Sequence, residues 1–507
     1  MPHPSRARWI YRLMLFFTVI TVCHPTSYAS ARDIVIGQGT DVSLLDPHYS
    51  TSASDVNVFF NLYDNLVMRD ENLNLTPGLA TSWKLVDDKT WHFKLREGVV
   101  FHNGERFSAD DVKFSLDRAV SENPRTSVFA ALNTIERVEI LDPSTVSIVT
   151  KQPDPLLPTR LSYYGGMMMP KRYFEQVGME GFRKDPVGTG ALKFVEWRKN
   201  ERLVFEANKQ YWRAPLPYEK VIYKPYPETA ARIAALIAGE VDLITAVPPD
   251  QVEVIQKSGT AKVEGALYAG FFAYYLNAKH PPLDNKLVRQ ALHYAIDRQA
   301  IVKKLWRRRG VVPNDAYPNV DKIGYDQSKP PFEFDPKKAK ELLAKAGYKG
   351  EEIVIESAVG YLANDKQLTE TLGAMFQEVG IKAKVQLIEY SVRAQKMRQK
   401  AIDGLLLGDP TSTLLDPDGM FWRLLQPGGL VDYWRHAEWD RLMGEARFLQ
   451  DPKKRDALYK QAAKIFLDEV PVLIVLQPEK TFALKKDLSW KARSDELVVV
   501  YDIKPTQ

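Results

Sequence analysis

Short runs in which apolar and polar residues alternate predict β-strands in the first half of the chain. In 90–95 every second residue is apolar, as in a half-buried strand. The apolar segments 138–141 and 145–149 flank a turn at 142–144, which predicts a hairpin. The region 71–187 is therefore expected to be rich in strands.

Apolar residues spaced three and four apart predict helices further along the chain. In 335–347 an Asp-Pro pair provides an N-cap and a first helical residue, and Gly347 provides a left-handed stop. Similar patterns occur at 451–466 and at 366–380. These segments predict amphipathic helices that each bury one face.

Several of these helices lead directly into a predicted strand. Gly239 separates a helical pattern from the apolar run 241–244, and Gly380 separates another from the segment 381–385. An alternation of helices and strands is typical of parallel sheets covered by helices. The sequence thus predicts an α/β protein with at least two lobes.

The first residues have the pattern of a secretory signal peptide. Arg6, Arg8 and Arg12 precede the apolar run 13–23, and the small residues 29–31 follow. At 1.5 Å per residue an eleven-residue run is too short to cross a hydrocarbon core about 30 Å thick. We expect these residues to be removed on export.

Composition and charge limit the classes of protein to which the chain can belong. The chain has 507 residues, of which 45% are hydrophobic and 26% charged, as in globular proteins of two or three domains. Loss of 1–31 removes three Arg and lowers the net charge from +5 to +2, so no electrostatic footprint for nucleic acid remains. The single cysteine, Cys23, follows Val22 rather than a small residue, so a lipid anchor is not expected.

Motifs of covalent chemistry are absent from the sequence. It contains no G-x-S-x-G, S-x-x-K, H-E-x-x-H or P-loop pattern. No two His of the mature chain are spaced as local metal ligands, so we expect no metal site, no cofactor and no catalytic residue. A pair of carboxylates from distant segments would escape such a search, which leaves a secreted hydrolase as an alternative.

A series of ordered motifs carries a resemblance to a known family. The chain resembles the extracytoplasmic solute-binding proteins of ABC transporters, family 5, whose members are receptors for peptides, nickel and opines. The matching segments, in order, are 77–83, 91–96, 98–104, 107–112, 186–190, 238–242, 288–298 and 334–339.

The resemblance implies an α/β, two-lobed periplasmic binding protein of type II. Its ligand cleft would lie between the lobes, and the first lobe would carry an extra β-rich subdomain. Transferred to this chain, the divisions are 1–31 for the signal peptide, 32–70, 188–285 and 479–507 for lobe I, 71–187 for the extra subdomain, and 286–478 for lobe II.

The resemblance also places a ligand-binding stretch at 405–420. In dipeptide receptors this stretch carries a carboxylate that binds the peptide's α-ammonium group, with a Trp nearby. An ungapped alignment places Thr413 at the position of that carboxylate and Pro410 at the position of that Trp. A threonine cannot neutralise an ammonium group. Asp409 is therefore the alternative anchor, and Thr411 of the same loop is a further candidate contact.

Three more candidate contacts lie elsewhere. The resemblance implies that Arg393 lies near the cleft and pairs with a ligand carboxylate, although a solvated helix face with Lys396 and Arg398 is an equally good interpretation. Tyr268 and Phe271 flank a strand expected to cross between the lobes.

The functional prediction is a monomeric periplasmic receptor that performs no covalent chemistry. It would capture a peptide by hinge closure and deliver it to ABC permease subunits in the inner membrane. Alternative ligands are an opine, a sugar conjugate or a metal chelate. From other classes, a secreted hydrolase and a periplasmic chaperone remain open.

Overall fold

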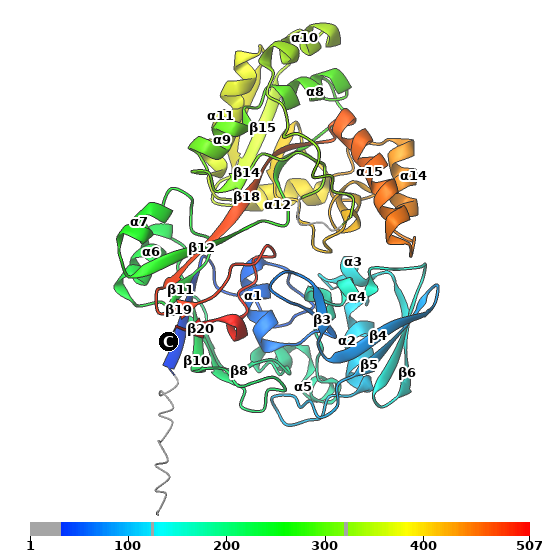
Figure 1. Cartoon of the computed structure of the whole chain (residues 1–507), viewed down its shortest axis with the longest axis vertical. Helices are drawn as coiled ribbons and strands as arrows, with labels where there is room; N and C mark the ends of the chain where they lie inside the picture. The colour runs from blue at the N-terminus through cyan, green and yellow to red at the C-terminus, as the bar shows by residue number, and fades with distance from the viewer. Residues whose placement is uncertain (1–31, 123–125, 319–322, 507) are drawn as a thin grey trace, which may run out of the picture.

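Two halves joined along one side make up the molecule (Figure 1). The computed structural model describes residues 32–122, 126–318 and 323–506, so the predicted signal peptide 1–31 lies outside the described residues. No helix within these ranges is long and apolar enough to span a membrane.

A mixed sheet and its covering helices form the part of the lower half that lies next to the junction. Strand β1 runs parallel to both β10 and β11, whereas β8, β9 and β10 form an antiparallel meander. The elements are β1 (Arg32–Gln38), α1 (Ala53–Leu62), α5 (Lys171–Lys184), β8 (Leu192–Arg198), β9 (Arg202–Ala207), β10 (Tyr218–Pro225), α6 (Thr229–Ala238), β11 (Leu243–Ile244), α7 (Val252–Lys257), β12 (Ala261–Leu267), β19 (Leu488–Ser489), η3 (Val500–Asp502) and β20 (Lys504–Pro505).

The remainder of the lower half contains an antiparallel sheet of order β4-β5-β7-β6 with its own hydrophobic core. Ser108 begins α2 with a capping box, in which Asp111 bonds back to the Ser108 backbone at 2.9 Å. The elements are β2 (Val67–Arg69), β3 (Leu75–Pro77), β4 (Ala80–Asp87), β5 (Thr90–Leu95), α2 (Ala109–Ala119), α3 (Phe129–Leu132), β6 (Ile135–Asp142), β7 (Thr145–Thr150), α4 (Leu157–Arg160) and η1 (Tyr164–Gly166).

The upper half is built on strands in the order β16-β15-β17-β13-β18. β15 is parallel to β16 and β17, while β13 is antiparallel to β17 and β18. The elements are β13 (Phe272–Leu276), α8 (Lys286–Tyr294), α9 (Arg298–Lys304), β14 (Gly310–Val311), α10 (Pro336–Ala346), β15 (Ile353–Ala358), α11 (Asp365–Glu378), β16 (Ala383–Ile388), α12 (Tyr390–Gln399), β17 (Leu405–Gly408), η2 (Pro417–Gly419), α13 (Phe421–Leu425), α14 (Ala437–Ala446) and α15 (Pro452–Glu469).

One long strand, β18 (Val472–Lys485), belongs to both halves. Its residues 472–476 pair with β13 in the upper half, and its residues 479–485 pair with β12 in the lower half (Figure 1). The two sheets are therefore continuous through β18, which runs along the joined side of the molecule.

The local predictions agree closely with these elements. The 90–95 strand is β5, the 138–149 hairpin is β6 and β7, and the 335–347 helix is α10, with Asp335 accepting from the Lys338 amide and Gly347 at φ 70°. The expectation of parallel sheets was only partly right. Strands β11, β12, β13 and β14 all run antiparallel to β18, which crosses between the halves.

Candidate ligand-binding site

The predicted ligand-binding stretch 405–420 begins with β17 and continues into the loop that follows it. All four residues of β17 are buried, and the chain leaves the sheet at Asp409 toward the lower half. There it pairs with the segment that enters β13, since the Phe271 amide donates to the Pro410 carbonyl at 3.1 Å and the Ser412 amide donates to the Ala269 carbonyl at 2.7 Å. The loop is thus fixed against the crossing segment by main-chain hydrogen bonds.

Asp409 and Arg393 both contact one tyrosine, Tyr361. The Tyr361 hydroxyl donates to Asp409 Oδ1, and the Arg393 guanidinium carbon lies 4.0 Å from the centre of the Tyr361 ring. Burial, followed by the Asp409 charge, raises the pKa of Tyr361 well above 10, so the hydroxyl stays protonated and remains a donor.

Arg393 does not lie on a solvated helix face. It is 8% exposed and is the buried residue of α12, and its Nε donates to the Leu407 carbonyl at 3.3 Å. Lys396 of the same helix instead pairs with Glu356 at 2.6 Å and with Asp403 at 2.8 Å. The structure therefore separates the residues that the sequence pattern grouped together.

Tyr268 and Thr411 meet between the two halves. Their hydroxyl groups share a hydrogen bond, and Lys480 Nζ lies 4.2 Å from the centre of the Tyr268 ring. Lys480 also pairs with Glu496 at 2.7 Å. Burial and the Asp409 charge raise the pKa of Tyr268 well above 10.

Phe271 and Thr413 occupy different surroundings from these four residues. Phe271 is 1% exposed and packs in a hydrophobic cluster of the upper half. The Thr413 hydroxyl lies 3.4 Å from the Gly419 carbonyl oxygen, while its own carbonyl accepts from Arg69 Nη2 at 2.9 Å. The structure therefore brings Tyr268, Thr411, Asp409 and Arg393 toward one region, and gives Thr413 a main-chain contact with the lower half.

Sequence reasoning missed Tyr361 and Arg69. Tyr361 follows shortly after β15, and Asp409 follows β17, which is parallel to β15. Because ligands of α/β proteins bind at the carboxyl ends of parallel strands, that rule would have singled out Tyr361. Arg69 is 344 residues from Thr413 along the chain, and no local signal connects them.

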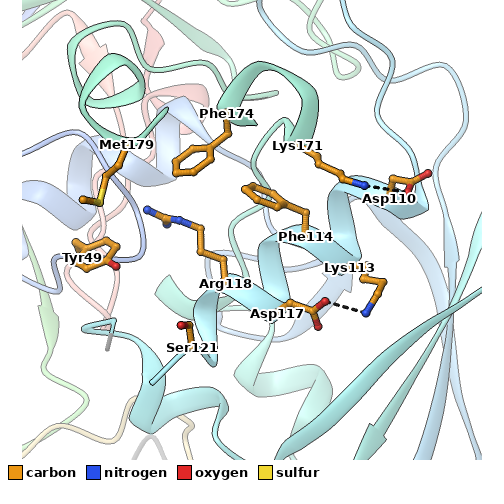
Figure 2. A pocket seen from close by; sticks show the side chains of 10 residues that line it. All are labelled: Tyr49, Asp110, Lys113, Phe114, Asp117, Arg118, Ser121, Lys171, Phe174 and Met179. Atoms are coloured by element: carbon orange, nitrogen blue, oxygen red, sulfur yellow. Dashed lines mark hydrogen bonds and ion pairs between the residues drawn. The ribbon is translucent and has the colours of Figure 1, made fainter. Parts of the chain in front are cut away.

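A surface pocket of about 570 Å³ lies elsewhere, between α2 and α5 of the lower half (Figure 2). Its lining shares no residue with the Asp409 region; the lining residues are Tyr49, Asp110, Lys113, Phe114, Asp117, Arg118, Ser121, Lys171, Phe174 and Met179. Within the described ranges, no group of three or more His, Cys, Asp or Glu is arranged to hold a metal ion.

The profile described as bacterial extracellular solute-binding proteins, family 5 middle, matches residues 74–431. The chain therefore belongs to this family of extracytoplasmic solute-binding proteins. Its fold is that of a two-lobed periplasmic binding protein of type II with a ligand cleft between the lobes. The lower half described above is one lobe and the upper half is the other.

Individual relatives align over nearly the whole chain. A di/tripeptide-binding protein 3 of Pseudomonas aeruginosa is 28% identical, covering 88% of this chain and 90% of the relative. A glutathione-binding protein GsiB of Shigella dysenteriae is also 28% identical, covering 95% and 96%. The structure of NikZ from Campylobacter jejuni in complex with Ni(L-His) is 26% identical, with a TM-score of 0.81 over 93% of this chain and 99% of NikZ.

These findings define the class of the protein. It is the substrate-binding component of an ABC import system and a transport receptor rather than an enzyme. The hydrolase interpretation is excluded by this membership, because the family consists of binding proteins.

Proposed function

We propose that this receptor captures a short peptide or a peptide-like solute between its lobes. The observation that carries the proposal is that Asp409 and Arg393 both contact Tyr361, Asp409 at the hydroxyl group and Arg393 over the ring. A carboxylate and a guanidinium at the edge of one sheet suit a ligand with an ammonium group and a carboxylate. Relatives that bind di- and tripeptides and glutathione support the same ligand class.

Each predicted contact then takes a specific role. Asp409 receives the ammonium group in place of the carboxylate that Thr413 cannot supply, and Arg393 pairs with the ligand carboxylate. The hydroxyl pair of Tyr268 and Thr411 bonds to the ligand's main chain. Phe271, at 1% exposure, supports the crossing segment from the core without touching the ligand.

Strand pairing supports the following choice of lobe boundaries. β13 pairs with β17 and β18 in the upper sheet, which favours a first crossing near residue 270 rather than at 285. The proposed boundary at 478 falls in the middle of β18, where pairing passes from one sheet to the other. The core formed by residues of the 66–187 region supports an extra β-rich subdomain that covers 71–187.

Export and delivery complete the proposed function. The family is periplasmic, and we assign residues 1–31 as a cleaved signal peptide with no lipid on Cys23. The mature protein acts as a monomer and presents its ligand to permease subunits in the inner membrane.

A second ligand class has support of its own. Thr413 and Pro410 replace the amine-binding pattern of dipeptide receptors, and the similar protein NikZ was solved with Ni(L-His). A metal chelate or an opine is therefore the alternative ligand, again with carboxylates for Arg393 to bind.

The test is a binding panel on the mature protein. Native mass spectrometry of freshly purified protein identifies any retained ligand, and equilibrium dialysis then measures di- to pentapeptides, glutathione, an opine and Ni(L-His). We expect saturable binding of at least one short peptide at micromolar concentration or below, about −8 kcal/mol. Binding of the opine or chelate without any peptide would replace the peptide proposal by the alternative.

A further inference from the structure

A buried ion pair joins the two lobes away from the Asp409 region. Arg160, the last residue of α4 in the lower lobe, places Nη2 2.5 Å from Oδ2 of Asp418 in η2 of the upper lobe. The side chains are 7% and 2% exposed, so the contact is shielded from solvent. In Figure 1, α4 lies at the edge of the lower lobe that faces the upper lobe.

Two further contacts surround this pair and bridge the same lobes. Arg69 donates from Nη2 to the Thr413 carbonyl at 2.9 Å, and Leu73 packs with Ala269 and Leu415 in a small hydrophobic cluster. The loop that follows Asp409 is thus held to the lower lobe by charged, polar and apolar contacts together.

Each charge of the bridging pair has a second partner in its own lobe. Arg160 Nε donates to Asp154 at 2.8 Å, and Arg447 Nε lies 2.6 Å from Asp418 Oδ1. A buried charge left without a partner is strongly destabilising. When the lobes separate, Arg160 keeps Asp154 as a partner and Asp418 keeps Arg447. The contact can therefore break and re-form without leaving a buried charge unpaired.

We propose that Arg160 and Asp418 are positioning residues for solute capture, whose ion pair forms when the lobes close and holds them closed. This inference rests on the proposed receptor function, and it assigns part of the free energy of closure to the chain itself rather than to the ligand. By linkage, anything that favours the closed form raises the apparent affinity for a ligand that binds that form.

The test measures lobe closure directly with Asp418→Asn. Spin labels on cysteines introduced at the exposed positions Glu136 and Lys345 report the distance between the lobes in mature protein. Titration with the tightest-binding solute among the di- to pentapeptides, glutathione, the opine and Ni(L-His) gives Kd. Without ligand, we expect the equilibrium constant for closing, the ratio of closed to open protein, to fall about five- to tenfold. Where the open form dominates without ligand, Kd should rise by about the same factor, because the buried Asp418 acts through the closing equilibrium.

Two variants separate this role from a general loss of stability. Asp117→Asn removes an exposed ion pair with Lys113 inside the lower lobe and should change neither the distance distribution nor Kd. Arg160→Lys keeps a positive charge beside Asp154 but loses the planar guanidinium group. Its closing equilibrium constant should therefore fall less than that of Asp418→Asn. If Asp418→Asn does not fold, Arg160→Lys tests the inference in its place.

Unchanged closing in a folded Asp418→Asn or Arg160→Lys protein would overturn the inference. The distance measurement without ligand does not depend on the ligand's identity. Failure of every solute in the panel would therefore count against the proposed function alone, whereas unchanged closing with intact peptide binding would count against the ion pair alone.

Discussion

At the scale of single residues, the site depends on groups whose partners are distant in the chain. Asp409 is fixed by Tyr361, and Arg393 lies over the same ring. Since Tyr361 remains protonated, it orients the Asp409 carboxylate by donating to one of its oxygens. In the proposed site, the other carboxylate oxygen accepts a hydrogen bond from the ammonium group of the ligand.

Replacing Asp409 with Asn should weaken binding of any ligand with a free ammonium group. Loss of a charge-assisted hydrogen bond costs about 1.5–3 kcal/mol, which corresponds to roughly a 10- to 150-fold higher Kd in calorimetric titration. Tyr361→Phe should have a smaller effect, because it leaves the charge in place. Wild-type affinity of Asp409→Asn for a peptide, with the same preference for that peptide over its N-acetylated form as in the wild type, would show that another residue receives the amine.

A buried histidine predicts how stability depends on pH. Burial, and next the Arg118 charge, lower the pKa of His48 to about 4. The folded state therefore disfavours the proton that an unfolded histidine accepts below about pH 6.5, so stability is lost as the pH falls from 6.5 toward 4. Between pH 7 and pH 5 this loss should amount to about 2 kcal/mol.

Urea unfolding of wild type and His48→Leu at several pH values measures that loss. The variant will be less stable at pH 7, since it loses the contact of Nε2 with the Met167 carbonyl, but its stability should fall less steeply with acid. Parallel pH profiles of the two proteins would contradict the assignment.

At the scale of elements, local sequence predicts starts and ends well. Asp335 and Gly347 are the N-cap and C-cap of α10, as the Asp-Pro pair and the glycine indicate, because caps depend only on adjacent backbone groups. The apolar run 241–244 was predicted as a strand, but only Leu243–Ile244 pairs as β11. Asp242 instead accepts from the Val35 amide at 2.7 Å through its side chain, a contact 207 residues away in the sequence.

The N-cap of α10 offers a matched pair of variants. Asp335→Ala removes the bond to the Lys338 amide at 2.8 Å and should lower the free energy of unfolding by about 1 kcal/mol in urea titration. Lys340→Ala, an exposed change in the same helix, should stay within about 0.5 kcal/mol of wild type. Equal stability of the two variants would show that the Asp335 side chain does not stabilise the helix.

At the scale of the whole molecule, β18 connects the lobes along one side and side-chain contacts connect them elsewhere. At the other side, the Gln450 amide between α14 and α15 lies 3.5 Å from the Asp88 carbonyl in the β4–β5 turn (Figure 1). If the receptor captures its ligand by lobe closure, as proposed, these two turns move apart when a ligand enters or leaves.

A crosslink between these turns should therefore stop ligand exchange. Cysteines introduced at Asp88 and Gln450, joined by a short bismaleimide in the ligand-bound protein, should slow ligand dissociation at least about tenfold. The mature chain is expected to carry no other cysteine, so each single-cysteine protein treated in the same way is the control. Unchanged dissociation after complete crosslinking would contradict exchange by lobe separation.

Local patterns in the chain were sufficient to predict the α/β class, the capped helices and the hairpin of β6 and β7. The ordered motifs of the chain were sufficient to identify the family. The helices and the hairpin depend on residues a few positions apart, whose conformational preferences act before the chain is folded. The burial of Arg393, the Tyr361–Asp409 bond and the contact of Arg160 with Asp418 emerged only in the folded molecule. They join segments up to 258 residues apart, and such contacts are selected by the packing of two lobes rather than by any local preference.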